Sequence, residues 1–330
     1  MKNSLYAFFL LIQNLLFVSL FGQEVFLPRG LILQNPSINP ESSILGELPT
    51  FQIEVDECSS RMSVSDLRSF IANAALQEWA FFGFHEVDER SQAFQIPIEQ
   101  AQRVFRGRNW LTEDNAKRVS KSIAGYWAST EDGLWIINQQ NSSWEVDIDN
   151  YDWELPWSAS FISWIMCEAG LDQNQFKRSI AHYHYIDQGI IDALSENNTS
   201  SIYTAYSVGQ FEPSPGDLLC RSRRSQYLEL NERIEDLGSP SRGHCDVLIK
   251  MNLDSAIVIG GNVRDSVTLK LLPIKRDIKN KIESIGSPYR MIYAHLKLKE
   301  DFGSFDQRGI DVIHEFFTQK DLPSSLLFSE

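Results

Sequence analysis

Apolar residues recur at helical spacing through the middle of the chain. Over residues 63–83 they fall three or four positions apart, which predicts a helix that opens at a serine cap and stops at a glycine. Its apolar positions are Leu67, Phe70, Ile71, Ala74, Ala75 and Trp79. The same spacing predicts helices over residues 112–125 and 156–170 and over most of 174–194. The segment 142–157 is rich in Trp and Asp and is predicted to be a loop.

The pattern then changes to short, β-branched runs separated by turn signals, which are typical of strands. We expect five strands, over residues 216–222, 244–252, 255–262, 266–274 and 289–298. Helices followed by strands indicate an α+β fold with a C-terminal antiparallel sheet. A last apolar pattern after residue 300 predicts a C-terminal helix packed on the sheet.

The N-terminus has the pattern of a signal peptide. One lysine is followed by an apolar run that reaches Phe21, and Gly22 follows it. We therefore expect residues 1–22 to direct export, to a secreted or periplasmic location. The alternative is an uncleaved anchor that holds the protein at a membrane, because the run is near the lower length limit for spanning. Residues 23–62 contain four prolines with many Ser and Asn, which predicts an extended lead-in or linker.

Composition narrows the range of functions. Hydrophobic residues make up 43% of the chain, which is enough for a core, and 330 residues fit one large domain or two ordinary ones. Residues 299–330 are expected to form a C-terminal helical extension. The net charge of −14 argues against nucleic acid as a partner. No spacing of Cys and His indicates a metal, and no cofactor is expected. The sequence leaves the oligomeric state open.

The four cysteines are too few for a disulfide scaffold. Cys220 and Cys245 lie on predicted neighbouring strands and are the candidate disulfide pair. Cys167 lies on the opposite face of its predicted helix from Ser158, and we expect it to be a core thiol.

Ser158 lies in the first turn of the predicted helix 156–170, where backbone N–H groups lack intrahelical partners. A nucleophile there gains donors for a developing oxyanion, but a serine also needs a general base. His244, after a glycine at the start of a strand, is the candidate base, and Asn262 is the candidate orienting residue. Gly260 and Gly261 would leave room for close approach. The alternative is that Ser158 only caps its helix.

Other residues are candidates for binding a substrate at this site. Trp153 and Trp157 flank the helix start and are able to stack on a sugar or peptide, with core packing as the alternative. Arg221 and Arg223 follow the first strand and are able to hold a carboxylate or phosphate, with a solvated loop as the alternative. His182 is placed beside the same cleft.

Three motifs resemble the cysteine- and histidine-dependent amidohydrolase/peptidase group (CHAP) and its NlpC-like relatives. They are WSASFISWIMCEAG from Trp157, GHCDVLI from Gly243 and IGGNVRDSVTL from Ile259. The chain is also similar to the bacterial domain of unknown function 2272, through PWSASFISW, ALQEWAFFG and GYW. The resemblance covers about residues 63–298.

The resemblance implies a papain-like fold with a partly barrelled sheet. It places Ser158, where most relatives have Cys, at the nucleophile position, His244 at the base position and Asn262 at the orienting position. The implied function is that of a secreted hydrolase that cleaves amide bonds of peptidoglycan or a peptide, as an amidase or endopeptidase. The alternative is a non-catalytic module that binds peptidoglycan or a protein. A toxin aimed at a rival's cell wall would share the chemistry.

Overall fold

The computed structural model describes residues 38–42, 49–53, 58, 67–90, 111–146, 152–197 and 199–299. All of them belong to one compact unit, Pro36–Phe305. The predicted signal segment and the predicted C-terminal helix lie outside the described residues. Within the predicted lead-in, strands β1 (Ile38–Ser42) and β2 (Pro49–Ile53) pair antiparallel.

The helices lie largely where the hydrophobic pattern predicts them. They are α3 (Leu67–Phe82), α5 (Glu113–Ala128), α6 (Gly133–Val146), α7 (Ser158–Glu168), α8 (Tyr183–Leu194) and the short α9 (Leu230–Glu235). The Thr112 cap of α5 is confirmed, since its side chain accepts a hydrogen bond from the Asn115 N–H. Helices α6 and α9 were not predicted, and α6 extends to Val146, into the segment expected to be a loop. Helix α8 begins only at Tyr183, later than predicted.

All five predicted strands are present in an eight-stranded sheet with the order β3-β8-β7-β6-β5-β10-β4, and β9 pairs with β8. The strands are β3 (His85–Asp88), β4 (Tyr203–Tyr206), β5 (Leu218–Ser222), β6 (Gly243–Met251), β7 (Ser255–Val263), β8 (Ser266–Arg276), β9 (Ile282–Ile285) and β10 (Ala294–Leu298). Strand β3 runs parallel to β8. The sheet is therefore mixed and not closed, which corrects the expectation of an antiparallel, partly barrelled sheet.

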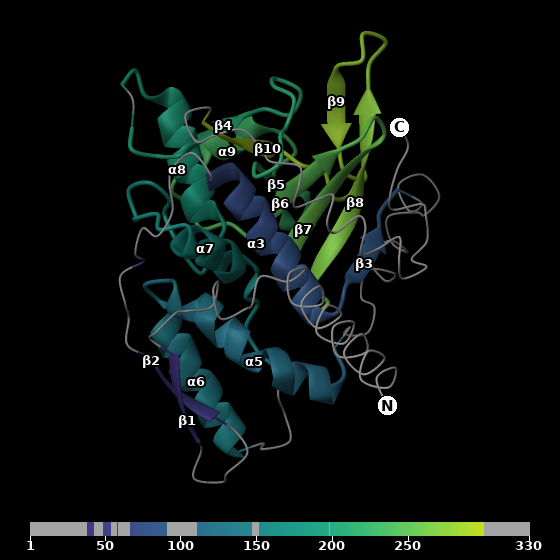
Figure 1. The fold of residues 1–330 in the computed structure, drawn as a ribbon. Coiled ribbons are helices and arrows are strands. Elements are labelled where there is room, and N and C mark those ends of the chain that lie inside the picture. The colour runs from purple at the N-terminus through teal and green to yellow at the C-terminus, as the bar shows by residue number, and fades with distance from the viewer. Residues whose placement is uncertain are drawn as a thin grey trace, which may run out of the picture. The chain divides into compact units, whose positions relative to one another are not determined.

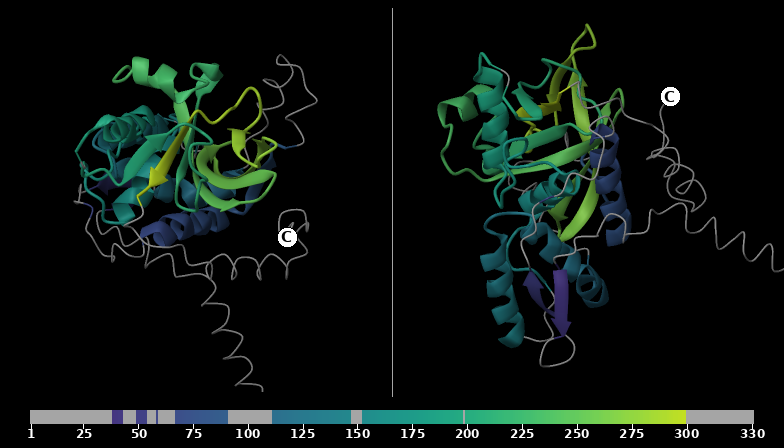
Figure 2. Two further views of the ribbon diagram at one scale, coloured as in Figure 1. Left: turned by 90° about the horizontal axis from the view of Figure 1, so that it is seen from above. Right: turned by 60° about the vertical axis from the view of Figure 1, so that its left-hand side comes forward.

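Helices α3 and α7 pack against the strands that carry the candidate site (Figures 1 and 2). Helix α7 contacts β6 and β7, and α3 contacts β6, β7 and β8. Aromatic side chains fill the space between the helices: Tyr126 of α5 lies against Trp157, Phe161 and Trp164. This packing fixes the start of α7 over the central strands.

Two disulfides link distant parts of the described chain. Cys220 and Cys245 join β5 to β6, as expected for the candidate pair. Cys167 pairs with Cys58, so its prediction as a core thiol was wrong; the sequence gives no spacing signal for a bond across 109 residues. None of the helices in the described ranges combines the length and apolar character needed to cross a bilayer.

Candidate active site

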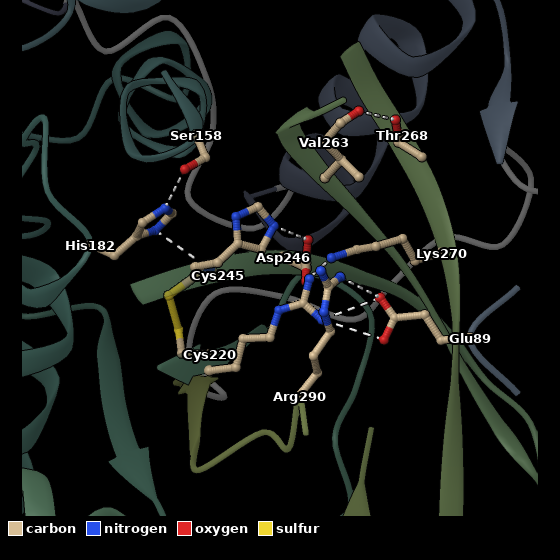
Figure 3. A network of polar contacts seen from close by, with 12 residues as sticks. Glu89, Ser158, His182, Cys220, Cys245, Asp246, Val263, Thr268, Lys270 and Arg290 are labelled. Carbon is tan, nitrogen blue, oxygen red and sulfur yellow. Dashed lines mark hydrogen bonds and ion pairs between the residues drawn. A yellow bond between two sulfur atoms is a disulfide. The ribbon is translucent and has the colours of Figure 1, made fainter. Parts of the chain in front are cut away.

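Ser158 is the first residue of α7 and is buried, with 4% of its surface exposed. The N-cap position belongs to Trp157, whose side chain caps nothing, so the interpretation of Ser158 as a cap was wrong. The Ser158 hydroxyl instead hydrogen-bonds to Nε2 of His182 at 2.8 Å (Figure 3). The first N–H groups of a helix lack intrahelical acceptors, so α7 presents donors beside this hydroxyl.

His182, at the start of α8, binds Ser158 as a hydrogen-bond donor. Its Nδ1 atom receives the backbone N–H of Cys245 at 3.2 Å and also contacts the Tyr185 hydroxyl. A backbone N–H can only donate, so Nδ1 carries no hydrogen. Burial and the neighbouring His244 hold the pKa of His182 well below its usual value, so the ring is neutral. Its one hydrogen therefore lies on Nε2 and points to Ser158.

The ladder geometry explains why the Cys245 N–H is available. The Cα atoms of Cys220 and Cys245 lie 4.1 Å apart, the spacing of an antiparallel pair that exchanges no backbone hydrogen bonds. On its other side β6 pairs with β7 only from Val247 onward. The N–H that points toward β7 at Cys245 thus has no ladder partner, and the imidazole takes it.

His244 and Asp246 form a second pair on β6, two residues apart and therefore on one face of the strand. His244 Nε2 lies 2.9 Å from Asp246 Oδ1. Burial alone would raise the pKa of Asp246, but the charge of Lys270 and the bond to His244 hold it well below its usual range. Asp246 is therefore a carboxylate and accepts the Nε2 hydrogen.

The remaining ring nitrogen of His244 is an available base. Burial lowers the pKa of His244 to about 4, against the opposing effect of Asp246, so the ring is neutral at pH 7. With its hydrogen on Nε2, the lone pair lies on Nδ1. No residue in the described part of the chain hydrogen-bonds to this atom. The two histidines of the site therefore differ in role: His182 donates, and His244 is able to accept.

A network of ion pairs lies next to Asp246 (Figure 3). Lys270 Nζ lies 2.5 Å from Asp246 Oδ2, and burial lowers the pKa of Lys270 to about 8. Beside this pair, Glu89 is held by Arg221 at 3.3 Å and by Arg290 at 3.5 Å. Arg221 was expected to bind substrate, but it lies within β5 and its buried guanidinium is engaged with Glu89.

Two glycines of β7 allow close packing: Gly260 against the His244–Asp246 pair, and Gly261 against helix α7. A Cβ on Gly260 would lie 2.8 Å from His244 Nε2, and a Cβ on Gly261 would lie 2.6 Å from Phe161 Cβ of α7. The ring centroids of His182 and His244 are 5.5 Å apart. The expectation that Gly260 and Gly261 leave room for close approach is confirmed: His244 packs on Gly260 of β7, and it lies beside His182, which contacts Ser158.

Asn262 does not orient His244, contrary to expectation. With its amide turned to satisfy both polar atoms, it accepts the Trp157 N–H at 2.9 Å and donates to Asp265 at 3.1 Å. Its φ of +54° places it where β7 departs from the register of β8, which turns the side chain toward the start of α7. The orienting partner of His244 is Asp246, which the sequence reasoning missed although the His-x-Asp alternation on one strand was visible.

The two predicted stacking residues belong to the core. Trp157 is 1% exposed and packs on Phe82 and Tyr126. Trp153 is 8% exposed and packs on Trp144. This burial favours core packing, the alternative for these two residues, over stacking on a sugar or peptide. Arg223, in contrast, follows β5 and is exposed.

No group of three potential metal ligands comes together among the residues that the structure describes. The family model described as "Uncharacterized protein conserved in bacteria (DUF2272)" matches residues 114–290. This is more than half of the chain, and the chain belongs to that family. The matched range contains Ser158, His182, His244, Asp246 and Lys270. No curated protein matches the chain, and no solved structure matches it.

Proposed function

We propose that this DUF2272 chain is a hydrolase that cleaves amide bonds with Ser158 as the nucleophile. The observation that carries the proposal is the His244–Asp246 pair: it leaves Nδ1 of His244 without a hydrogen-bond partner among the described residues, beside His182, which contacts Ser158. In this reading Asp246 takes the orienting role that was expected of Asn262.

The proposed reaction follows from the positions of the hydrogens. Ser158 Oγ attacks the carbonyl carbon, and its proton passes to Nδ1 of His244. The oxyanion that forms is stabilised by backbone N–H groups in the first turn of α7. His244 then gives the proton to the leaving amine, and water releases the acyl group by the same steps. His182 holds Ser158 Oγ through its Nε2 hydrogen and leaves the serine hydrogen free to point elsewhere.

The substrate part of the proposal rests on the resemblance to the CHAP and NlpC-like enzymes. Their motifs around the nucleophile and histidine positions match those around Ser158 and His244, which supports a papain-like relationship and an amide bond of peptidoglycan as the target. Two disulfides are typical of proteins outside the reducing cytosol and support a secreted or periplasmic location.

A non-catalytic binding module is the second candidate, and two observations favour it. The histidine that touches Ser158 donates to it and cannot take its proton. In addition, a pKa of about 4 makes His244 a weak base, because a general base works best with a pKa near the operating pH. Both features reduce the reactivity of a serine nucleophile.

The test is digestion of purified peptidoglycan by residues 23–330, with the released fragments separated and weighed. Ser158→Ala and His244→Ala should each abolish the products. Ser160→Ala is the matched control, because it removes from the same turn a buried hydroxyl that has no hydrogen-bond partner among the described residues. Products that persist in Ser158→Ala would refute the proposal. Products from Ser158→Cys but not from wild type would indicate an intact site whose serine is not activated, which is the binding-module alternative.

A further inference from the structure

Two arginines lie at the end of the strands that carry the site. The β5–β6 ladder pairs Arg221 with His244, and the Arg223 N–H continues it by donating to the Arg242 carbonyl at 2.8 Å. Arg223 begins a short 3-10 turn directly after β5, and Arg242 directly precedes β6, so the two arginines lie opposite each other just beyond the Arg221–His244 pair. Both are exposed.

Electrostatic contacts agree with this placement. The charge of Arg223 is one of the groups that lower the pKa of His182, whose Nε2 is bonded to Ser158. Although Arg223 is exposed at the surface, partial desolvation by the surrounding protein lowers its pKa, and the charges of Arg221 and Arg242 lower it further. Arg223 therefore lies within electrostatic reach of His182 on one side and of two other guanidinium groups on the other.

Neither arginine has a carboxylate partner among the described residues. The two acidic groups of the nearby network are already engaged, Asp246 with Lys270 and Glu89 with Arg221. Like charges opposite each other on neighbouring strands destabilise the pair. The protein as a whole carries a charge of −14, so an uncompensated cationic cluster runs against its overall composition.

We propose that Arg223 and Arg242 form a subsite that binds an anionic group, a carboxylate or a phosphate, on the substrate of Ser158. The guanidinium fork matches the two oxygens of such groups, and a bound anion would relieve the repulsion between the two arginines. The position relative to Ser158 makes the anion part of the substrate, and that assignment rests on the proposed function. Binding of the anion itself needs no turnover.

The test uses small anions and histidine NMR signals of residues 23–330. The probes are N-acetylglycine, its uncharged analogue N-acetylglycinamide, and inorganic phosphate. We expect at least one of the two anions to shift the ring signals of His182, and the amide to have no effect. Binding of N-acetylglycine would identify a carboxylate site, and binding of phosphate alone would identify a phosphate site.

Variants decide whether the two arginines are responsible. Arg223→Gln combined with Arg242→Gln should weaken the binding at least about tenfold, a loss of about 1.4 kcal/mol. Lys279→Gln, which removes an exposed positive charge from the turn before β9, is the matched control and should bind as wild type does. Equal binding of the amide, no shift with either anion, or unchanged affinity in the double variant would overturn the subsite.

These outcomes are separate from those of the peptidoglycan digestion. Anion binding that depends on both arginines, in a protein that digests nothing, would leave the subsite standing and refute the hydrolase. If digestion requires Ser158 but neither anion shifts the His182 signals, the hydrolase would be supported and the subsite would be refuted.

Discussion

His182 donates its Nε2 hydrogen to the Ser158 hydroxyl across 2.8 Å, so the histidine in contact with the candidate nucleophile is the one that cannot accept its proton. The cause is a backbone N–H, that of Cys245, which occupies the other ring nitrogen. Because this donor belongs to the backbone, a side-chain substitution at Cys245 keeps it as long as the backbone of β6 is unchanged. Any activation of Ser158 therefore depends on His244.

The tautomer of His182 is directly measurable. In protein labelled with ¹⁵N-histidine, we expect His182 to be neutral, with its hydrogen on Nε2, from pH 8 down to pH 5, because two donors crowd Nδ1 and burial disfavours the charged ring. Tyr185→Phe should leave the tautomer unchanged, since the Cys245 N–H remains. A hydrogen found on Nδ1 would contradict the assignment and would make His182 a possible base.

Stability should fall as the pH is lowered from about 6.5 toward 4. Burial lowers the pKa of His244 to about 4 in the folded protein, whereas the unfolded value is near 6.5. Between these values the unfolded chain binds more protons than the folded protein. The free energy of unfolding is therefore highest above pH 6.5, and protonation of His244 in the unfolded chain lowers it by up to about 3 kcal/mol at pH 4. Urea unfolding at pH 7.5 and pH 5 would measure this.

His244→Asn is the comparison for that experiment. The variant lacks the titrating group, so its stability should decline less than that of the wild type between the two pH values. An identical decline in both proteins would assign the pH dependence to other groups and remove the evidence for a neutral, buried His244.

The hydrophobic pattern predicted the elements of this site better than the contacts within it. Helical spacing placed Ser158 at the start of a helix, and β-branched runs placed His244 at the start of a strand. The bond between Ser158 and His182 was not predictable, because it depends on how the segment before α8 packs on β6. Glu89 was missed for a related reason: it follows β3, a four-residue parallel edge strand that has too few positions to show a period.

The roles of Asn262 and Asp246 show a different limit. Asn262 follows two glycines on the strand next to His244, which made it a reasonable partner in sequence. A local departure from register turns it toward Trp157 instead, and such irregularities depend on backbone conformation, with φ positive at Asn262. Alternation along β6 would have indicated Asp246, because residues two apart share a face.

Gly260 is expected to tolerate no side chain. A Cβ there would lie 2.0 Å from Asp246 Oδ1 and 2.8 Å from His244 Nε2, which is closer than real Cβ atoms come. Gly260→Ala should therefore break the His244–Asp246 hydrogen bond and cost about 2 kcal/mol or more in the free energy of unfolding, by strain and by unpaired buried groups. The histidine NMR spectrum and urea unfolding would report the two effects.

The control for that substitution is Gly238→Ala. A Cβ on Gly238 would meet no atom within 4 Å, and only its φ of +83° is strained, which costs about 1 kcal/mol. It should leave the His244 signals unchanged. If Gly260→Ala also left the His244 signals unchanged, the close packing of Gly260 on the His244–Asp246 pair would not hold in solution.

The Cys220–Cys245 disulfide should stabilise the fold without fixing the His182 tautomer. It closes a loop with a sequence separation of 25 residues, so replacement of both cysteines by alanine should cost about 3 kcal/mol through the added entropy of the unfolded chain. The Nδ1 partner of His182 is the backbone N–H at position 245, which the variant keeps. Urea unfolding would measure the loss, and a changed tautomer would show that the disulfide also positions this N–H.

Lys270 should set the basicity of His244. Its ammonium group lies 2.5 Å from Asp246 Oδ2 and is one of the charges that lower the pKa of His244. Lys270→Met removes that charge and keeps most of the side-chain volume, so Asp246 acts on His244 alone and the pKa of His244 should rise from about 4 toward its usual value. NMR titration of the His244 ring signals would measure the change.

The matched comparison is Lys270→Arg, which keeps the positive charge and should leave the pKa of His244 low if the variant folds. If the serine chemistry is real, Lys270→Met should also make the site a better base near pH 7, so peptidoglycan cleavage should rise relative to Lys270→Arg at equal folded concentration. A pKa of His244 that stays near 4 in Lys270→Met would show that burial alone sets it, and the ionic network behind Asp246 would then have only a structural role.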